Sequence, residues 1–260
     1  MIPLVDMHCH LIAGVDDGPR TLDDAVAMCR ILLDEGVDAV HGLAHQNEFY
    51  PDVTPEVIRT VHAQLTERLR AENLPLMVYL GAEIIVVPDL DEVWSAGRLL
   101  SVADRGQYLF IEMPHGLFVD LGHTIWRLTQ LGLRPILAHP EQTPELLHSP
   151  ELLATWVDQG LLTQVSSANV LRMQSAAGQK ALRNWFRRGL VHTLGSDGHS
   201  PDRRPPHLAA AAHTVVEWVG SAAADRILGG NGLAILQGLP LRVAPPPKSS
   251  AFSWLPRWWR

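Results

Sequence analysis

The sequence has very few cysteines: Cys9 and Cys29 are the only two among 260 residues. Two cysteines exclude the dense disulfide framework of a small secreted domain and are typical of a reducing compartment. The first residues lack a charged segment followed by an apolar core, so we expect no signal peptide. No apolar run approaches the roughly 20 residues that a membrane-spanning helix needs. We therefore expect a cytoplasmic protein.

Basic side chains are also in deficit, with 21 Lys and Arg against 28 Asp and Glu and a formal net charge of −7. Nucleic-acid-binding domains usually carry a basic face, so we expect no nucleic-acid partner. The deficit is uneven, because residues 245–260 contain Lys248, Arg257 and Arg260 and no acid. The net charge of the remaining residues is therefore more negative than that of the whole chain.

What the chain does contain is the composition of a globular protein, with 47% apolar and 19% charged residues, in a length that suits one large domain. Short apolar runs alternate with amphipathic stretches. The predicted strands are residues 2–7, 37–43, 76–85, 108–112, 135–138, 163–166 and 191–194. Strands separated by helices indicate βαβ units, and seven parallel strands are enough to close a barrel. We predict an α/β fold.

Residue types that bind metals follow these strands. The residues at or just after strand ends are His8, His10, His45, Glu83, Glu112, His139, Asp197 and His199, and Asp17 lies in the loop that begins at His8. In a β/α barrel the carboxyl ends of the strands meet at one rim. We therefore expect these nine side chains to converge.

A single His after a strand is more often a hydrogen-bonded loop residue, but the repetition of this pattern argues for a shared role. Burying four carboxylates without cations would be costly. A mixed set of imidazoles and carboxylates suits Mn, Zn or Fe better than Ca. We predict two or three divalent ions, with Mn favoured. A net positive site would take an anionic substrate such as a phosphate ester, with metal-activated water as the nucleophile.

Two arginines, Arg203 and Arg204, come directly behind Asp197 and His199. A guanidinium group offers a fork of donors that matches phosphate oxygens. The alternative is a solvated pair that caps the turn at Pro205. We favour a phosphate-binding role for Arg204.

Several motifs carry a family resemblance. They are Asp6-Met7-His8-Cys9-His10, Asp16-Asp17-Gly18-Pro19, Gly81-Ala82-Glu83, Ile111-Glu112, Ala138-His139-Pro140-Glu141, Ser196-Asp197-x-His199 and Arg204-Pro205-Pro206-His207. Together they resemble the PHP (polymerase and histidinol phosphatase) superfamily, and within it the protein tyrosine phosphatases of bacterial capsule and exopolysaccharide loci, the CpsB/YwqE type. The resemblance covers residues 1–240, and residues 241–260 form a Pro-rich linker and a Trp/Arg tail.

The resemblance implies a distorted (β/α)7 barrel of the PHP type with three metal ions. The first ion would be held by His8, His10, Glu83 and Asp197. The second would be held by Glu83, Glu112 and His139. The third would be held by Asp17, His45 and His199. Asp197, His199 and Arg204 would take part in hydrolysis of phosphotyrosine by a metal-activated hydroxide. The implied partner is a membrane-associated tyrosine kinase of polysaccharide assembly.

The chain departs from the family at two positions, with Gln46 where His is common and Gln142 where Arg is common. Two other functions therefore stay open: a histidinol-phosphatase-like hydrolase of small phosphate monoesters, and a barrel that binds the kinase without catalysis. The aromatic and basic residues at 250–260 suit a weak membrane or partner contact, which would place the protein at the inner face of the membrane. A disordered tail, or one folded back onto the barrel, is the alternative.

Overall fold

The computed structural model describes residues 3–241 and contains a single sheet of seven parallel strands in chain order. The strands are β1 (Leu4–His10), β2 (Val37–Gln46), β3 (Met77–Ile85), β4 (Tyr108–Glu112), β5 (Arg134–Ala138), β6 (Leu162–Ser166) and β7 (Thr193–Gly195). Each predicted strand is present, although β1 and β2 continue three residues further than expected, through His10 and Gln46. Continued pairing along β1 and β2 extends both strands, so that the candidate ligands of β1 lie within the sheet.

Backbone hydrogen bonds join the two ends of the sheet. The N–H of Asp197 donates to the carbonyl of His8 at 2.7 Å, and the N–H of His10 donates to the carbonyl of Gly198 at 2.9 Å. The segment after β7 therefore lies against β1 and completes the ring. This confirms the predicted α/β barrel.

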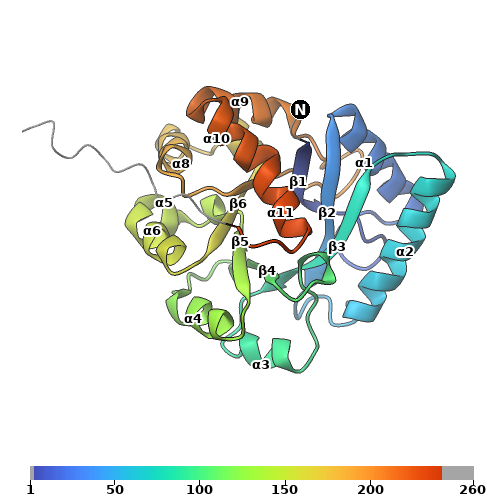
Figure 1. Ribbon diagram of the computed structural model, residues 1–260, viewed down its shortest axis with the longest axis horizontal. Coiled ribbons are helices and arrows are strands. Elements are labelled where there is room, and N and C mark those ends of the chain that lie inside the picture. The colour runs from blue at the N-terminus through green and yellow to red at the C-terminus, as the bar shows by residue number, and fades with distance from the viewer. Residues whose placement is uncertain (1–2, 242–260) are drawn as a thin grey trace, which may run out of the picture.

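Helices surround the strands (Figure 1). They are α1 (Leu22–Asp34), α2 (Pro55–Ala71), α3 (Leu90–Ser95), α4 (Gly122–Gln130), α5 (Pro144–His148), α6 (Pro150–Asp158), α7 (Ser167–Leu171), α8 (Ala176–Arg188), α9 (Ala209–Val219), α10 (Ser221–Asp225) and α11 (Asn231–Leu236). Short 3-10 turns cover Val102–Asp104 and Pro140–Gln142, and a π turn at Arg226–Gly230 links α10 to α11. No helix within residues 3–241 is long and apolar enough to cross a membrane.

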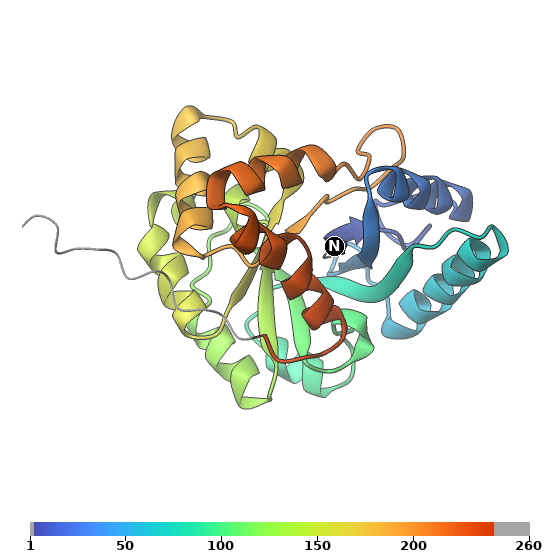
Figure 2. The same ribbon diagram turned by 45° about the horizontal axis from the view of Figure 1, so that its top comes forward.

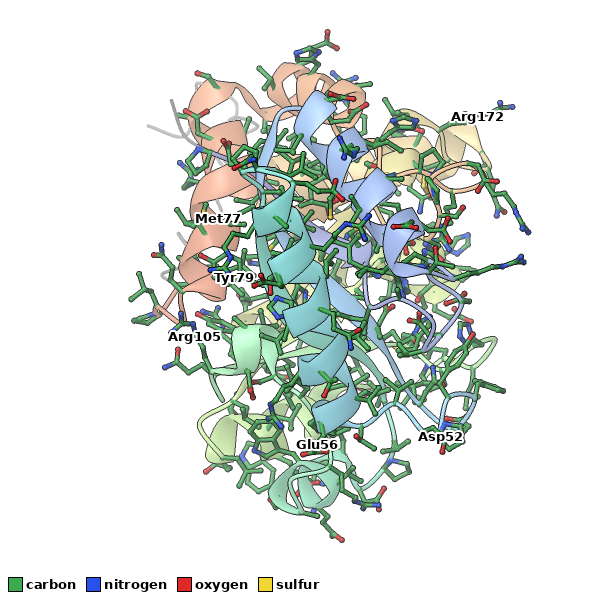
Figure 3. The ribbon with its side chains drawn as sticks, turned by 90° about the vertical axis from the view of Figure 1, so that its right-hand side faces the viewer. Asp52, Glu56, Met77, Tyr79, Arg105 and Arg172 are labelled. Carbon is green, nitrogen blue, oxygen red and sulfur yellow. The ribbon has the colours of Figure 1, made fainter. Side chains whose placement is uncertain are left out.

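Sequence signals explain the long helices. Thr21 caps α1 with a capping box that includes Asp24, and Thr54 precedes Pro55 at the start of α2. The buried face of α1 includes Met28 and Cys29 and packs toward the sheet. In Figure 3, α2 runs along the side of the molecule, with Glu56 at its first turn.

The barrel has two apolar layers. The larger one lies between the sheet and the outer helices, and the smaller one fills the barrel interior with residues such as Met7 and Phe110. Helix α11 crosses one end of the barrel in both ribbon views (Figures 1 and 2) and adds Ile235 and Leu236 to the inner layer. A Cβ at Gly232 would lie 2.9 Å from Val5 Cγ1, so glycine permits this close packing.

Candidate metal centre

All nine candidate ligands converge at the carboxyl ends of the strands. Their side-chain donors form four overlapping groups, and within each group the donor atoms lie no more than 4.8 Å apart. The groups are His10, Asp17, His45 and His199; His8, His10 and Asp197; His8, Glu83 and His139; and His45, Glu83 and Glu112. The rim of the barrel therefore assembles residues that are spread over most of the chain.

Glu83 lies at the centre of this cluster. It is buried at the end of β3. Its Oε2 atom is 3.2 Å from His8 Nε2, 3.3 Å from His10 Nε2 and 3.5 Å from His45 Nδ1, and its Oε1 atom is 2.9 Å from His139 Nε2. One carboxylate thus faces four imidazoles.

A second part of the cluster is more open. Asp17 is half exposed, and its Oδ1 atom lies 3.4 Å from His45 Nε2 and 3.6 Å from His199 Nε2. Glu112 lies with His45 and Glu83, whereas His139 lies with His8 and Glu83. Glu83 is therefore the residue that links the groups on β4 and β5.

Two buried oxygen acceptors orient the first two histidines. Asp16 Oδ2 lies 2.8 Å from His10 Nδ1 and also accepts the backbone N–H of His45 at 2.9 Å. Gln164 Oε1 lies 3.0 Å from His8 Nδ1. Because these partners accept hydrogen bonds, each Nδ1 carries the proton and each Nε2 is left free to bind a cation.

Sequence reasoning missed the role of Gln164. It lies in the middle of β6, in the buried run Leu162–Ser166, where only its polarity distinguishes it. A buried amide in such a strand needs a partner, and that requirement was the available signal. Asp16 was visible in the motif beside Asp17, but its hydrogen bond to His10 was not.

Two other motif acids hold the site together without joining the cluster. Asp6 Oδ1 accepts the backbone N–H groups of His8 and Ser196, which tie β1 to the segment after β7. Glu141 Oε1 accepts from Ser166 N and Asn169 Nδ2. Burial raises the pKa of Asp6 to about 6 and also raises the pKa of Glu141. Each acid thus accepts hydrogen bonds that hold separate segments of the chain together.

Two candidate ligands have left-handed backbone conformations. His139 has a φ of 31° directly after β5, and Asp197 has a φ of 57° two residues after the end of β7. Such conformations are costly for residues other than glycine and cluster at functional sites. The sharp turns let the two side chains point back into the rim.

The charges of the cluster depend on one another. Burial alone would lower the pKa of His10, but the carboxylates of Asp16 and Glu83 raise it well above its usual value. Burial likewise opposes protonation of His139, yet Glu83 raises its pKa to about 9. Burial would raise the pKa of Glu83, but the neighbouring histidines hold it well below its usual range. The carboxylates and imidazoles thus stabilise one another's charged forms, and a bound cation would compete with protons for the same nitrogens.

The residues fit divalent cations. His45 Nδ1 and Glu112 Oε1 are both buried, lie 3.3 Å apart and have no hydrogen-bond partner in the described part of the chain. His8 Nε2 and His10 Nε2 lie 3.3 Å apart and both face Glu83. Unpartnered nitrogen and oxygen donors that face one another are the ligand set of transition metals such as Mn, Zn and Fe.

A cavity of about 490 Å³ opens over the cluster. Arg204, half exposed, lines it and donates from Nη2 to Asp197 Oδ2. Gln142 is exposed on the same wall. Gln46 instead points away, with its amide hydrogen-bonded to Val53 O and Leu100 N. The Gln at position 46 therefore joins neighbouring loops, whereas Gln142 faces the cavity.

Known proteins share this fold. A family model described as capsular polysaccharide synthesis, CpsB/CapC, matches residues 4–237. The tyrosine-protein phosphatase YwqE of Bacillus subtilis is 27% identical over 84% of this chain and 86% of its own, and tyrosine-protein phosphatase CpsB of Streptococcus pneumoniae is 25% identical over 90% and 98%. A solved structure described as YwqE from Bacillus subtilis and CpsB from Streptococcus pneumoniae, unique metal-dependent tyrosine phosphatases, superposes with a TM-score of 0.84 at 28% identity, covering 94% of this chain and 98% of that one.

Proposed function

The chain belongs to the CpsB/CapC family of capsular polysaccharide synthesis, and from this premise we propose that it is a metal-dependent protein-tyrosine phosphatase whose reaction takes place at the rim cluster. The observation that carries the proposal is the convergence of nine His, Asp and Glu donors beneath a cavity of about 490 Å³. The family relatives carry the phosphatase name, and the donor set supports metal dependence.

Three cations would account for all nine donors. His8, His10, Glu83 and Asp197 would hold the first, with Glu83 shared by a second held also by Glu112 and His139. Asp17, His45 and His199 would hold the third. We favour Mn, and Zn or Fe also suits these ligands. When bound, the cations would supply positive charge for phosphate oxygens and would lower the pKa of water so that it could attack phosphorus at neutral pH.

The protein's own residues position the reactants. Arg204 lies between Asp197 and the cavity, where its guanidinium group can donate to phosphate oxygens. Asp16 and Gln164 fix the rings of His10 and His8. Arg is common at position 142 in the family, but this chain has the amide of Gln142 there. Arg204 is therefore the main side-chain donor to the phosphate oxygens.

The wall of the cavity suits an aromatic ester. Phe49 and Leu117 line it from the loops after β2 and β4, and they are 65% and 61% exposed. Exposed apolar side chains beside a polar centre can cover the ring of a phosphotyrosine. The substrate we propose is a phosphotyrosine segment of the tyrosine kinase that assembles the polysaccharide, which would bring the enzyme to the inner face of the membrane. The Trp/Arg tail, which we expected to contact a membrane or partner, lies outside the described residues.

Metal removal tests the proposal directly. Dialysis against a chelator is expected to abolish hydrolysis of p-nitrophenyl phosphate and of a phosphotyrosine peptide, because nine ligands remain without the cations that activate water. Adding back Mn should restore both activities, and elemental analysis should find two or three ions per chain. Zn and Fe(II) serve as comparisons for metal preference.

Two results would contradict the proposed function. Activity that survives complete removal of metal, as measured by elemental analysis, would contradict the metal mechanism. A metal-loaded protein that binds a phosphotyrosine peptide but never releases phosphate would instead support the non-catalytic barrel.

Phe49→Ala tests the proposed substrate. We expect kcat/KM for a phosphotyrosine peptide to fall by about 3- to 10-fold, which corresponds to the loss of one aromatic contact. Hydrolysis of β-glycerophosphate, which has no ring, should be unchanged. Trp126→Ala is the matched control, because Trp126 is an exposed aromatic residue on α4 away from the cavity.

Equal losses on both substrates would assign Phe49 a structural role. Faster turnover of histidinol phosphate than of the phosphotyrosine peptide by the wild type would favour the small-molecule hydrolase.

A further inference from the structure

A second cavity, of about 460 Å³, adjoins the first. The two share Asp17, His199 and Arg204 as lining residues. The rest of the second cavity is lined on one side by the loop after β1, with Gly18, Pro19 and Arg20, and by Asp24 in the first turn of α1. The loop after β7 lines the other side with Ser200, Pro201, Asp202 and Arg203. A molecule whose phosphoryl group lies at the metal ligands can therefore extend directly into this space.

Two of the three arginines that line this cavity have guanidinium groups without a partner in the described part of the chain. Arg20 and Arg203 are exposed, and neither guanidinium group makes an ion pair or hydrogen bond within residues 3–241. Arg204, by contrast, is paired with Asp197. The guanidinium groups of Arg20 and Arg203 thus flank an open cavity without a carboxylate partner, and this arrangement suits an anionic ligand.

Besides Asp17, which belongs to the candidate ligands, the acids of the cavity already accept hydrogen bonds from neighbouring residues. Asp24 Oδ2 accepts from Thr21 N and Thr21 Oγ1, as part of the cap of α1. Asp202 Oδ1 accepts from the backbone N–H of Arg203 at 2.9 Å. These hydrogen bonds hold both carboxylates in local turns, whereas the guanidinium groups remain available.

The two loops are held firmly against the metal centre. Ser200 Oγ accepts the backbone N–H groups of Arg203 and Arg204, each at 3.0 Å, and His199 N donates to Arg204 O at 2.9 Å. On the other side, Gly18 N donates to Asp16 Oδ1 at 2.9 Å. The backbone of Arg203 is therefore fixed relative to the candidate ligands, and the segment that carries Arg20 is anchored at Gly18.

We propose that this second cavity is a subsite for a further anionic group of the substrate, a carboxylate or phosphate on a residue next to the phosphotyrosine. The proposal rests on the proposed phosphatase function and adds a preference to it. Consecutive Cα atoms lie about 3.8 Å apart, so a neighbouring side chain can enter a cavity that shares a wall with the first. The enzyme would then select phosphotyrosines in acidic or multiply phosphorylated segments.

The test measures binding, so that it does not depend on turnover. Fluorescent peptides carry a central non-hydrolysable (phosphonomethyl)phenylalanine flanked by Gln, by Glu, or by a second (phosphonomethyl)phenylalanine. Anisotropy with the Mn-loaded protein is expected to show about 10-fold tighter binding of the two anionic peptides than of the Gln peptide, as for two partly exposed charge pairs. The two arms distinguish a carboxylate from a phosphate.

The variant R20Q/R203Q should lose this preference and bind all three peptides as the wild type binds the Gln peptide. R172Q is the matched control, because Arg172 is exposed, lies outside both cavities and projects from the surface in Figure 3. Turnover of p-nitrophenyl phosphate should be the same in all three proteins, since that substrate carries one anionic group.

Equal affinity of the wild type for the three peptides would overturn the subsite, even with normal phosphatase activity. A preference that persists in R20Q/R203Q would also overturn it. Failure of the proposed function would look different: peptide binding with the predicted preference, but no release of phosphate from any substrate.

Discussion

Glu83→Gln is expected to lower phosphatase activity by more than about 100-fold, a larger loss than the 10- to 100-fold typical of residues that only orient metal ligands. Glu83 faces four imidazoles and belongs to two of the four donor groups. The amide has nearly the same shape but lacks the negative charge. It therefore weakens the hold on two cations in the proposed assignment.

The measurements are elemental analysis of the purified variant and kcat/KM for p-nitrophenyl phosphate with added Mn. Glu145→Gln is the matched control, because Glu145 is an exposed acid that lines the same cavity outside the donor groups. A Glu83→Gln protein with full metal content and activity would remove Glu83 from the centre of the site.

Gln164→Leu is expected to lower activity by about 10- to 100-fold while the protein remains folded. Leucine keeps the approximate size but removes the oxygen that accepts from His8 Nδ1. His8 would then lose the contact that fixes its ring and directs Nε2 toward Glu83. Gln164 Nε2 is itself buried and has no hydrogen-bond partner among residues 3–241, so the loss of the amide also removes an unsatisfied donor and limits the cost in stability.

The readouts are kcat, Mn affinity and the thermal midpoint of unfolding. Gln164→Glu should recover much of the activity, because a carboxylate also accepts a hydrogen bond from the imidazole. A parallel loss of thermal stability and activity in Gln164→Leu, without recovery in Gln164→Glu, would show that Gln164 serves packing alone.

Short apolar runs that alternate with amphipathic stretches were sufficient to predict all seven strands and the barrel, because each run is a buried strand of a parallel sheet. The short helices were harder to predict. The helix α3 and the helix α7 have five or six residues each, too few for a periodic pattern to emerge. Helix α10 is continued by a π turn, whose extra residue per turn leaves no clear signal in the sequence.

The convergence of the candidate ligands was predictable because chemistry and position coincide: each is a metal-binding residue type at or just after the end of a strand, apart from Asp17 in the loop after β1. Their hydrogen-bond partners were not, since Gln164 reaches His8 across 156 positions of the chain and no local pattern encodes that contact. The two departures from the family also needed the structure. Gln46 proves to be a link between loops, and Gln142 proves to face the cavity.

The hydrogen bonds between β1 and the segment after β7 determine when the cluster can form during synthesis of the chain. The first donors of the cluster, His8 and His10, meet Asp197 and Gly198 through backbone hydrogen bonds that close the ring. A nascent or truncated chain that ends before residue 199 lacks the last donors, Asp197 and His199. Such a chain cannot assemble the full cluster. Cations that bridge these two ends would fasten the earliest and latest parts of the chain together, and metal supply would thereby act on the persistence of the folded protein as well as on its chemistry.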